Sequence, residues 1–182
     1  NTSQGKNLIG SFFQPKAVIS DSSTIKTLPR REILAGYSEI CKYGLINNLD
    51  FWCWLEKNGH QVVQGETKFL SEAVKISCIS KAEIVKKDEK ESGERALLNL
   101  GHTFAHALEK ELNYSNELLH GEAVSIGIIL AFNLSNYLGY CPSNDVKRIT
   151  DHFKKINLRM PNSINKGIKI DNLIDNMSKD KK

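Results

Sequence analysis

The chain lacks several features that would assign it to a well-known class of protein. Its four cysteines among 182 residues, Cys41, Cys53, Cys78 and Cys141, show no Cys-x-x-Cys spacing. Nothing before residue 5 has the character of a signal peptide, and we expect free thiols in a protein of the reducing cytoplasm. No internal repeat, low-complexity stretch or long linker divides the sequence, which indicates one compact domain.

Long hydrophobic runs and strong charge are also missing. The longest nearly apolar run, from Ala123 to Phe132, is about half as long as a bilayer span requires and contains Ser125 and Gly127. We interpret it as a buried core helix and expect no membrane partner. The net charge is only +4, and no basic stripe with interleaved aromatic residues is present, so we expect no nucleic-acid partner.

The residue pattern predicts a mainly α-helical protein. Residues 1–26 read as an extended or β segment, with a short hairpin or edge strand over residues 7–20 that is broken at Gln14-Pro15. Residues 27–182 read as a helical domain. The expected helices begin near Pro29 and cover residues 32–46, 49–58 (closed by Gly59), 69–87, 97–112, 121–138, 143–156 and 171–177.

The polar residues between positions 94 and 127 are unusual for a solvated helix face. On one continuous helix, Arg95, Asn99, His102 and His106 would form a single stripe, with leucines and Phe104 on the opposite side. Arginine binds carboxylates and phosphates, asparagine donates and accepts, and histidine ligates metals or moves protons. The mixture favours a polyanionic, hydroxylated ligand near a cation.

Further candidates lie on either side of this stripe. His120 precedes the apolar run, and Glu39 and Lys42 lie three residues apart on one expected helix, with Gly36 and Gly44 allowing close approach. A carboxylate with two or three imidazoles would form a plausible zinc shell with one open position. Glu39 and Lys42 could instead be an ordinary helical ion pair, and His60 and His152 are expected to be solvated.

Four sequence blocks resemble the C-terminal half of the 3-dehydroquinate synthase family. They are GKNLIGSFFQPKAV (5–18), LPRREILAGYSEICKYG (28–44), KAEIVKKDEKESGERALLNLGHTFAHALE (81–109) and LLHGEAVSIG (118–127). The resemblance implies the multi-helical metal- and substrate-binding domain of the dehydroquinate synthase-like fold. That family places a dinucleotide-binding domain upstream, and no Gly-rich phosphate loop occurs here. We therefore expect a fragment or separated domain that is inactive alone.

The resemblance also implies a role for individual residues. Its metal ligands match Glu39, His102 and His120, so His106 is not a ligand but lies near the substrate phosphate and assists proton transfer. The pair that grips the substrate carboxylate matches Lys81 and Arg95. Residues that bind the ring hydroxyls or hold the metal ligands match Lys42, Asn99 and Glu91. Positions near the phosphate and the cofactor match Lys6 and Asn7, and a basic position near the site matches Lys181 or Lys182.

The activity implied is conversion of 3-deoxy-D-arabino-heptulosonate 7-phosphate, a phosphorylated keto acid, to 3-dehydroquinate in the shikimate pathway. The family uses NAD and Zn²⁺, or another divalent ion such as Co²⁺, in a cytoplasmic homodimer. Two alternatives stay open. One is a related sugar-phosphate cyclase or metal-dependent polyol dehydrogenase, and the other is a non-catalytic zinc-binding helical module.

Overall fold

The regular secondary structure is entirely helical in the part of the chain that the computed structural model describes, residues 9–10, 13, 15–91, 93–164 and 167–180. Seven α-helices and three short 3₁₀ helices occur there: η1 (Ser22–Thr27), α1 (Arg30–Asn47), α2 (Leu49–Val63), α3 (Thr67–Lys87), η2 (Glu94–Asn99), α4 (His102–Glu111), α5 (His120–Tyr137), α6 (Ser143–Ile156), η3 (Pro161–Ser163) and α7 (Ile170–Ser178). None of these helices is long and apolar enough to cross a bilayer.

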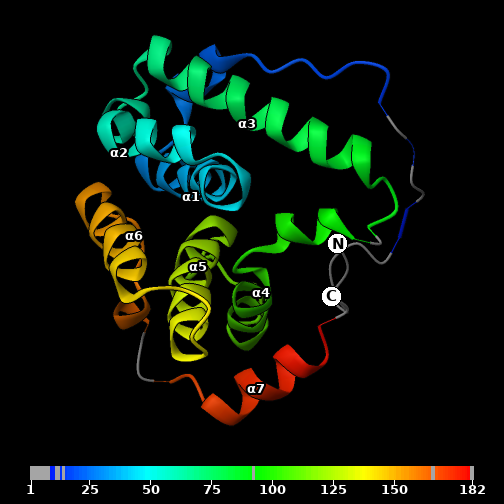
Figure 1. Ribbon diagram of the computed structural model, residues 1–182, viewed down its shortest axis with the longest axis vertical. Coiled ribbons are helices and arrows are strands. Elements are labelled where there is room, and N and C mark those ends of the chain that lie inside the picture. Colours follow the sequence, from blue (N-terminus) through cyan, green and yellow to red (C-terminus); the bar gives the residue numbers. More distant parts are fainter. Residues whose placement is uncertain (1–8, 11–12, 14, 92, 165–166, 181–182) are drawn as a thin grey trace.

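Helices α1 and α5 form the centre of the molecule. Figure 1 shows α2 and α3 beside α1 on one side, whereas α4 and α6 flank α5 and α7 lies beyond α4. The buried hydrophobic residues of these helices make one cluster, which includes Leu55, Ile126 and Phe153. Three elements of this core, α1 and the first turns of α4 and α5, position the candidate site.

The expected hairpin or edge strand over residues 7–20 does not occur in the described residues, where positions 15–20 form neither a helix nor a strand. The side chains of Val18 and Ile19 are largely exposed, at 75% and 92%. A strand needs a neighbouring strand to complete its hydrogen bonds, and the described residues offer none. Residues 7, 8, 11, 12 and 14 lie outside the described part.

The expected continuous helix over residues 97–112 is wrong, because the chain turns between η2 and α4. Gly101 takes the left-handed backbone conformation, with φ +76°. A Cβ atom at Gly101 would lie 2.6 Å from the backbone nitrogen of Ile128, so α4 begins directly against α5. Glycine is the residue that meets both demands. The stripe from Arg95 to His106 is therefore split between two elements.

The apolar helix predicted around Ala123 begins close to α1. Its first part is fully buried from Gly121 to Ile129, and its C-terminal part emerges towards solvent. A Cβ atom at Gly121 would lie 2.0 Å from the carbonyl oxygen of Ala35. This close approach of the two backbones brings the residue before Gly121 beside α1.

Two predictions about α1 and α2 need correction. Gly59 does not close α2, which continues to Val63. The missing side chain of Gly59 instead makes room for the hydroxyl of Tyr37. Gly44 does lie against the backbone of Trp52, but a Cβ atom at Gly36 would meet no described atom of another element within 4 Å, so Gly36 mediates no close approach there.

His152 is buried rather than solvated. Its Nε2 atom lies 3.0 Å from the hydroxyl of Tyr37, and its ring meets the ring of Trp52 edge-on at 5.0 Å. Position 152 lies on the same face of α6 as Ile149 and Ile156, three and four residues away, which explains the burial. His60 is exposed, as predicted.

Candidate metal centre

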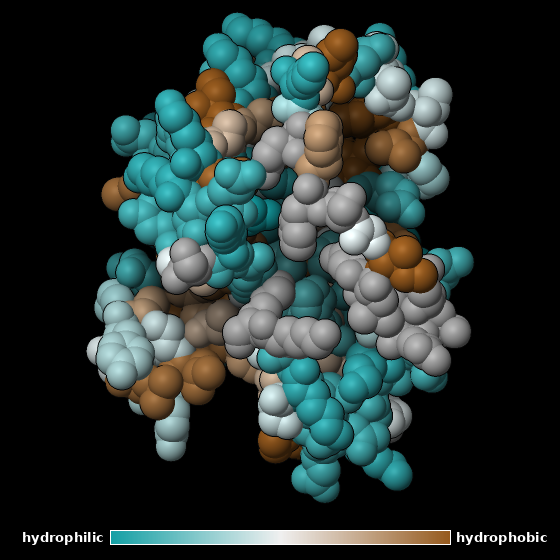
Figure 2. Space-filling view, turned by 90° about the vertical axis from the view of Figure 1, so that its right-hand side faces the viewer, coloured by the Kyte–Doolittle hydropathy of each residue, from teal (hydrophilic) through white to brown (hydrophobic). Residues whose placement is uncertain are grey.

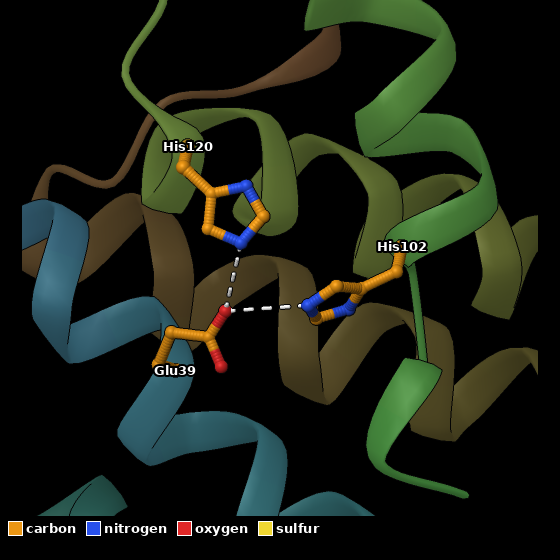
Figure 3. A group of neighbouring side chains, drawn as sticks. All are labelled: Glu39, His102 and His120. Carbon is orange, nitrogen blue, oxygen red and sulfur yellow. Dashed lines mark ion pairs between the residues drawn. The ribbon is translucent and has the colours of Figure 1, made fainter. Parts of the chain in front are cut away.

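Three residues from three helices converge at one point. Glu39 comes from the middle of α1, whereas His102 and His120 are the first residues of α4 and α5 (Figure 3). One carboxylate oxygen, Oε1 of Glu39, lies 3.5 Å from Nε2 of each histidine. The three ligand atoms lie within 4.8 Å of one another.

The other nitrogen of each ring is held by an acceptor. Nδ1 of His102 lies 3.1 Å from the carbonyl oxygen of Leu100, and Nδ1 of His120 lies 3.1 Å from Oε2 of Glu109. A carbonyl or carboxylate oxygen only accepts hydrogen bonds, so each Nδ1 carries the ring proton. In the neutral rings, both Nε2 lone pairs then face the carboxylate of Glu39.

This arrangement fits a divalent cation better than direct hydrogen bonds. Three electron-pair donors that face one another repel unless a positive charge lies between them. Ligand atoms about 2.0–2.1 Å from a tetrahedral zinc ion lie about 3.3–3.4 Å apart. The distance from Oε1 to each Nε2 is close to this, at 3.5 Å, and all three ligand atoms lie within 4.8 Å of one another. Direct N–H···O hydrogen bonds are about 2.7–3.2 Å long. A carboxylate with two imidazoles is a donor set that zinc and cobalt accept.

The charges around Glu39 keep it in the form that binds a metal. Burial alone would raise its pKa, but its contacts with His102 and His120 and with the charge of Lys42 together hold the pKa far below its ordinary value. Nζ of the buried Lys42 lies 2.6 Å from Oε2 of Glu39. Lys42 therefore engages one carboxylate oxygen, while the histidines face the other.

His106 lies beside the three convergent residues but outside the group. Its ring centre is 5.6 Å from that of His102 and 6.1 Å from that of His120. Its Nδ1 atom is directed to Oδ1 of Asp180, at 3.5 Å. The position next to the cluster, with a carboxylate behind the ring, suits proton transfer more than ligation.

The remaining described candidates lie on η2, α3 and the loop between them. Asn99 donates a 2.8 Å hydrogen bond to Glu91, so these two predicted residues meet. Arg95 is partly buried, and its guanidinium donates to the carbonyl of Glu89. Lys81 is exposed on α3, and η2 packs against both α3 and α1.

Four candidates fall outside the described residues: Lys6, Asn7, Lys181 and Lys182. Asp180, which precedes the last two, is described, and its second carboxylate oxygen is buried without a hydrogen-bond partner among the described residues.

Glu109 and Asp180 were not among the candidates from the sequence. Glu109 could have been found, because it lies three residues after His106 and seven after His102, on the same face of α4. Asp180 comes from a distant part of the chain, and no spacing rule connects it to His106.

The side of the molecule seen in Figure 2 is the one on which η2 and the C-terminal end of α7 lie. Hydrophilic residues dominate this face, and the hydrophobic ones gather in separate groups towards its edges.

Comparisons with known proteins identify the family of this chain. The family model described as 3-dehydroquinate synthase C-terminal matches residues 36–182, and the N-terminal model of that family matches residues 1–35. The 3-dehydroquinate synthase of Rhodospirillum rubrum is 49% identical over 87% of this chain and 41% of its own length. That of Ruegeria sp. TM1040 is 47% identical over 100% of this chain and 49% of its own length.

Two solved sugar-phosphate cyclases share the fold. A 2-epi-5-epi-valiolone synthase from Streptomyces hygroscopicus, with NAD⁺ and Zn²⁺ bound, has a TM-score of 0.85 at 23% identity and covers 98% of this chain and 49% of its own. A 2-deoxy-scyllo-inosose synthase complexed with carbaglucose-6-phosphate, NAD⁺ and Co²⁺ has a TM-score of 0.77 at 27% identity and covers 98% and 47%. The chain spans 41–50% of the length of its curated relatives. By the extent of the family match, the chain belongs to the 3-dehydroquinate synthase family.

Proposed function

We propose that the protein containing this chain is a 3-dehydroquinate synthase, a lyase that converts 3-deoxy-D-arabino-heptulosonate 7-phosphate to 3-dehydroquinate with release of phosphate. The observation that carries the proposal is the convergence of Glu39, His102 and His120 inside the region that matches the family. The curated relatives with this name support it.

In this proposal, Glu39, His102 and His120 hold a divalent ion, zinc or cobalt. Such an ion, when bound, supplies a Lewis acid that lowers the pKa of substrate hydroxyls and polarises a carbonyl. Lys42 sits against Glu39 and fixes the direction in which its carboxylate points. Asn99, hydrogen-bonded to Glu91, offers a polar group on η2 for the hydroxyls of the substrate ring.

The charged groups of the substrate need fixed cations. We assign Arg95 and Lys81 to the substrate carboxylate, because they lie on η2 and α3, which pack against each other. An arginine can bind a carboxylate with two parallel hydrogen bonds. Holding the carboxylate in one pose reduces the entropy that the reaction must overcome.

His106 is the proposed group for proton transfer beside the substrate phosphate. The carboxylate of Asp180 on its Nδ1 side favours a ring that carries its proton there, which leaves Nε2 to accept or return a substrate proton. In the absence of a strong dedicated base, positioning and electrostatics carry most of the chemistry.

NAD is the proposed redox cofactor. Lys6 and Asn7 are assigned to its side of the site, and most of its contacts are expected upstream of this chain. We accordingly propose that the isolated chain keeps the metal centre but does not turn over, and that the complete protein is a cytoplasmic homodimer.

A related cyclase acting on an uncarboxylated sugar phosphate is the second candidate, since a 2-deoxy-scyllo-inosose synthase with this fold was solved in complex with carbaglucose-6-phosphate, which has no carboxylate. Arg95 and Lys81 favour the carboxylated substrate, because neither a simple polyol nor an uncarboxylated sugar phosphate needs that pair.

The test joins this chain to the N-terminal half of the Rhodospirillum rubrum relative and measures phosphate release with NAD and Zn²⁺. We expect turnover of the seven-carbon keto-acid phosphate, loss of turnover in His102→Ala, and none in the isolated chain. Release of phosphate only from uncarboxylated sugar phosphates would identify the related cyclase instead. Turnover by the isolated chain at a rate comparable with the joined protein would contradict the requirement for the upstream half.

A further inference from the structure

Glu109 is a buried carboxylate next to a proposed metal ligand. It lies near the end of α4, is 4% exposed, and places Oε2 3.1 Å from Nδ1 of His120. The side chain of His120 is 41% exposed, so the acid is more deeply buried than the imidazole it contacts. A buried carboxylate is costly unless it is hydrogen-bonded to a donor or paired with a charge.

The spacing of residues along α4 explains why Glu109 meets His120. His102, His106 and Glu109 occupy one face of α4 at intervals of four and three residues, and this face looks towards the start of α5. One end of the face carries a proposed ligand, His102. The other end carries the acceptor that contacts the second histidine ligand, His120, across the helix interface.

The contact determines which nitrogen of His120 faces Glu39. An isolated imidazole can carry its proton on either nitrogen, and only the nitrogen without a proton can bind a metal. The carboxylate of Glu109 accepts from Nδ1 and so favours the proton there. Nε2, which lies 3.5 Å from Oε1 of Glu39, then presents its lone pair to the shared point.

The same contact restricts the ring itself. His120 is the first residue of α5 and is substantially exposed, and the contact with Glu109 limits the rotation of its ring. His102 is buried and its ring is oriented by the carbonyl of Leu100, within its own segment. His120 depends instead on an acidic side chain from another helix.

We propose that Glu109 is a positioning residue of the metal centre, which fixes the tautomer and orientation of His120 and adds negative charge behind the bound cation. The inference rests on the proposed function, in which Glu39, His102 and His120 hold the ion. A carboxylate behind a ligating histidine raises its basicity and typically contributes about 10–100-fold to metal affinity.

The test compares Glu109→Gln and Glu109→Ala with the unchanged chain in two measurements. The first is Zn²⁺ affinity by chelator competition, repeated with Co²⁺ to record its visible spectrum. We expect both variants to bind Zn²⁺ about 10–100-fold more weakly, with an altered Co²⁺ spectrum. Glu111→Gln is the matched control, because Glu111 is on the same helix but accepts from Asn172 of α7. Its Zn²⁺ affinity should be unchanged.

The second measurement is the tautomer of His120 by ¹⁵N NMR of the metal-free chain. We expect the Nδ1–H form in the unchanged chain and a shift towards Nε2–H in Glu109→Ala, which a purely structural role would not produce. An Nε2–H tautomer in the unchanged chain would overturn the proposal even if the variants fail to fold. Unchanged Zn²⁺ affinity in folded Glu109 variants would overturn it as well. If His120 carries its proton on Nδ1 but the chain binds no Zn²⁺, the result contradicts the proposed metal centre and supports only the contact between Glu109 and His120.

Discussion

Arg31 and Glu122 form a two-pronged ion pair that joins α1 to the first turn of α5. Nε and Nη2 of the arginine lie 2.7 and 2.6 Å from the two carboxylate oxygens. Glu122 also accepts from the backbone nitrogen of Leu119, at 2.9 Å. The pair is two residues from His120 on one helix and eight from Glu39 on the other, so it fixes the two elements that carry these residues.

Removing this pair should destabilise the fold and loosen the metal centre. Burial raises the pKa of Glu122, but the hydrogen bonds from Arg31 and Leu119 and the charges of Arg31 and Arg159 together outweigh burial and hold the pKa below its ordinary value of 4.5. We expect Arg31→Gln to lower the free energy of unfolding by about 1–3 kcal/mol near neutral pH. The contribution is present above pH 4.5 and is lost as the pH falls through the lowered pKa.

Urea unfolding at pH 7 measures this effect. Arg30→Gln is the matched control, because the hydrogen bond of Arg30 among the described residues is a long one, 3.5 Å to the carbonyl of Val63. It should change stability by less than about 0.5 kcal/mol. Equal losses in the two variants would contradict a special role for the pair.

Acid should destabilise the protein through His152. Burial lowers its pKa to about 4, from an ordinary value of 6.5. The unfolded state therefore takes up a proton before the folded state does, and stability falls as the pH drops from about 6.5 to about 4. The loss is at most about 3.4 kcal/mol, from 1.36 kcal/mol per pKa unit over about 2.5 units.

Urea unfolding at several pH values between 7 and 4 checks the acid effect. His152→Gln removes the titrating group and should flatten the stability profile in this window, whatever its effect at pH 7. The exposed His60 is the control, and His60→Gln should leave the slope as it is. An unchanged slope in His152→Gln would show that other groups cause the acid sensitivity.

Metal binding should distinguish ligands from neighbours. We expect Glu39→Ala, His102→Ala and His120→Ala each to weaken Zn²⁺ binding by more than about 100-fold, because each removes one of three ligands. His106→Ala should retain the tight site. Metal content and chelator competition on the purified chain measure both. A metal site that depends on His106 and not on Glu39 would refute the assignment. If the isolated chain binds no metal, the measurement is repeated with the N-terminal half restored.

The turn at Gly101 should tolerate no side chain. Gly101 and Gly139 have similar backbone angles, φ +76° and +80°, but a Cβ atom at Gly139 meets no atom within 4 Å. Gly139→Ala should therefore cost only about 1–2 kcal/mol, the strain of the left-handed conformation. Gly101→Ala should cost about 1–3 kcal/mol more, because the new atom meets the backbone of α5. Thermal or urea unfolding compares them, and equal costs would contradict the steric account.

The helical fold could be predicted because most helices have clear periodicity and ends. Residues 143–156 were predicted with the observed bounds, since Ile149, Phe153 and Ile156 mark one face. The break at Gly101 was missed, because its cause is the backbone of α5, which is distant in sequence. The strand near Val18 was predicted from alternating residues, but a strand also needs a partner.

For the site, spacing and the family resemblance supplied Glu39, His102 and His120, and the structure brings them together. Spacing alone would have paired His102 with His106. The contacts of Glu109 and Asp180 could not be predicted in the same way, because each connects separate elements and depends on how these pack.

The three convergent residues lie at positions 39, 102 and 120, and no two of them share a helix. A cation bound there would act as a reversible cross-link between α1, α4 and α5, closing chain segments of more than sixty residues and of eighteen residues. An ion that binds only this folded arrangement stabilises it by about 4 kcal/mol when present at 1,000 times its dissociation constant. The melting temperature of the chain would then depend on the free metal concentration, and removal of metal would first loosen the helix interfaces around Glu39.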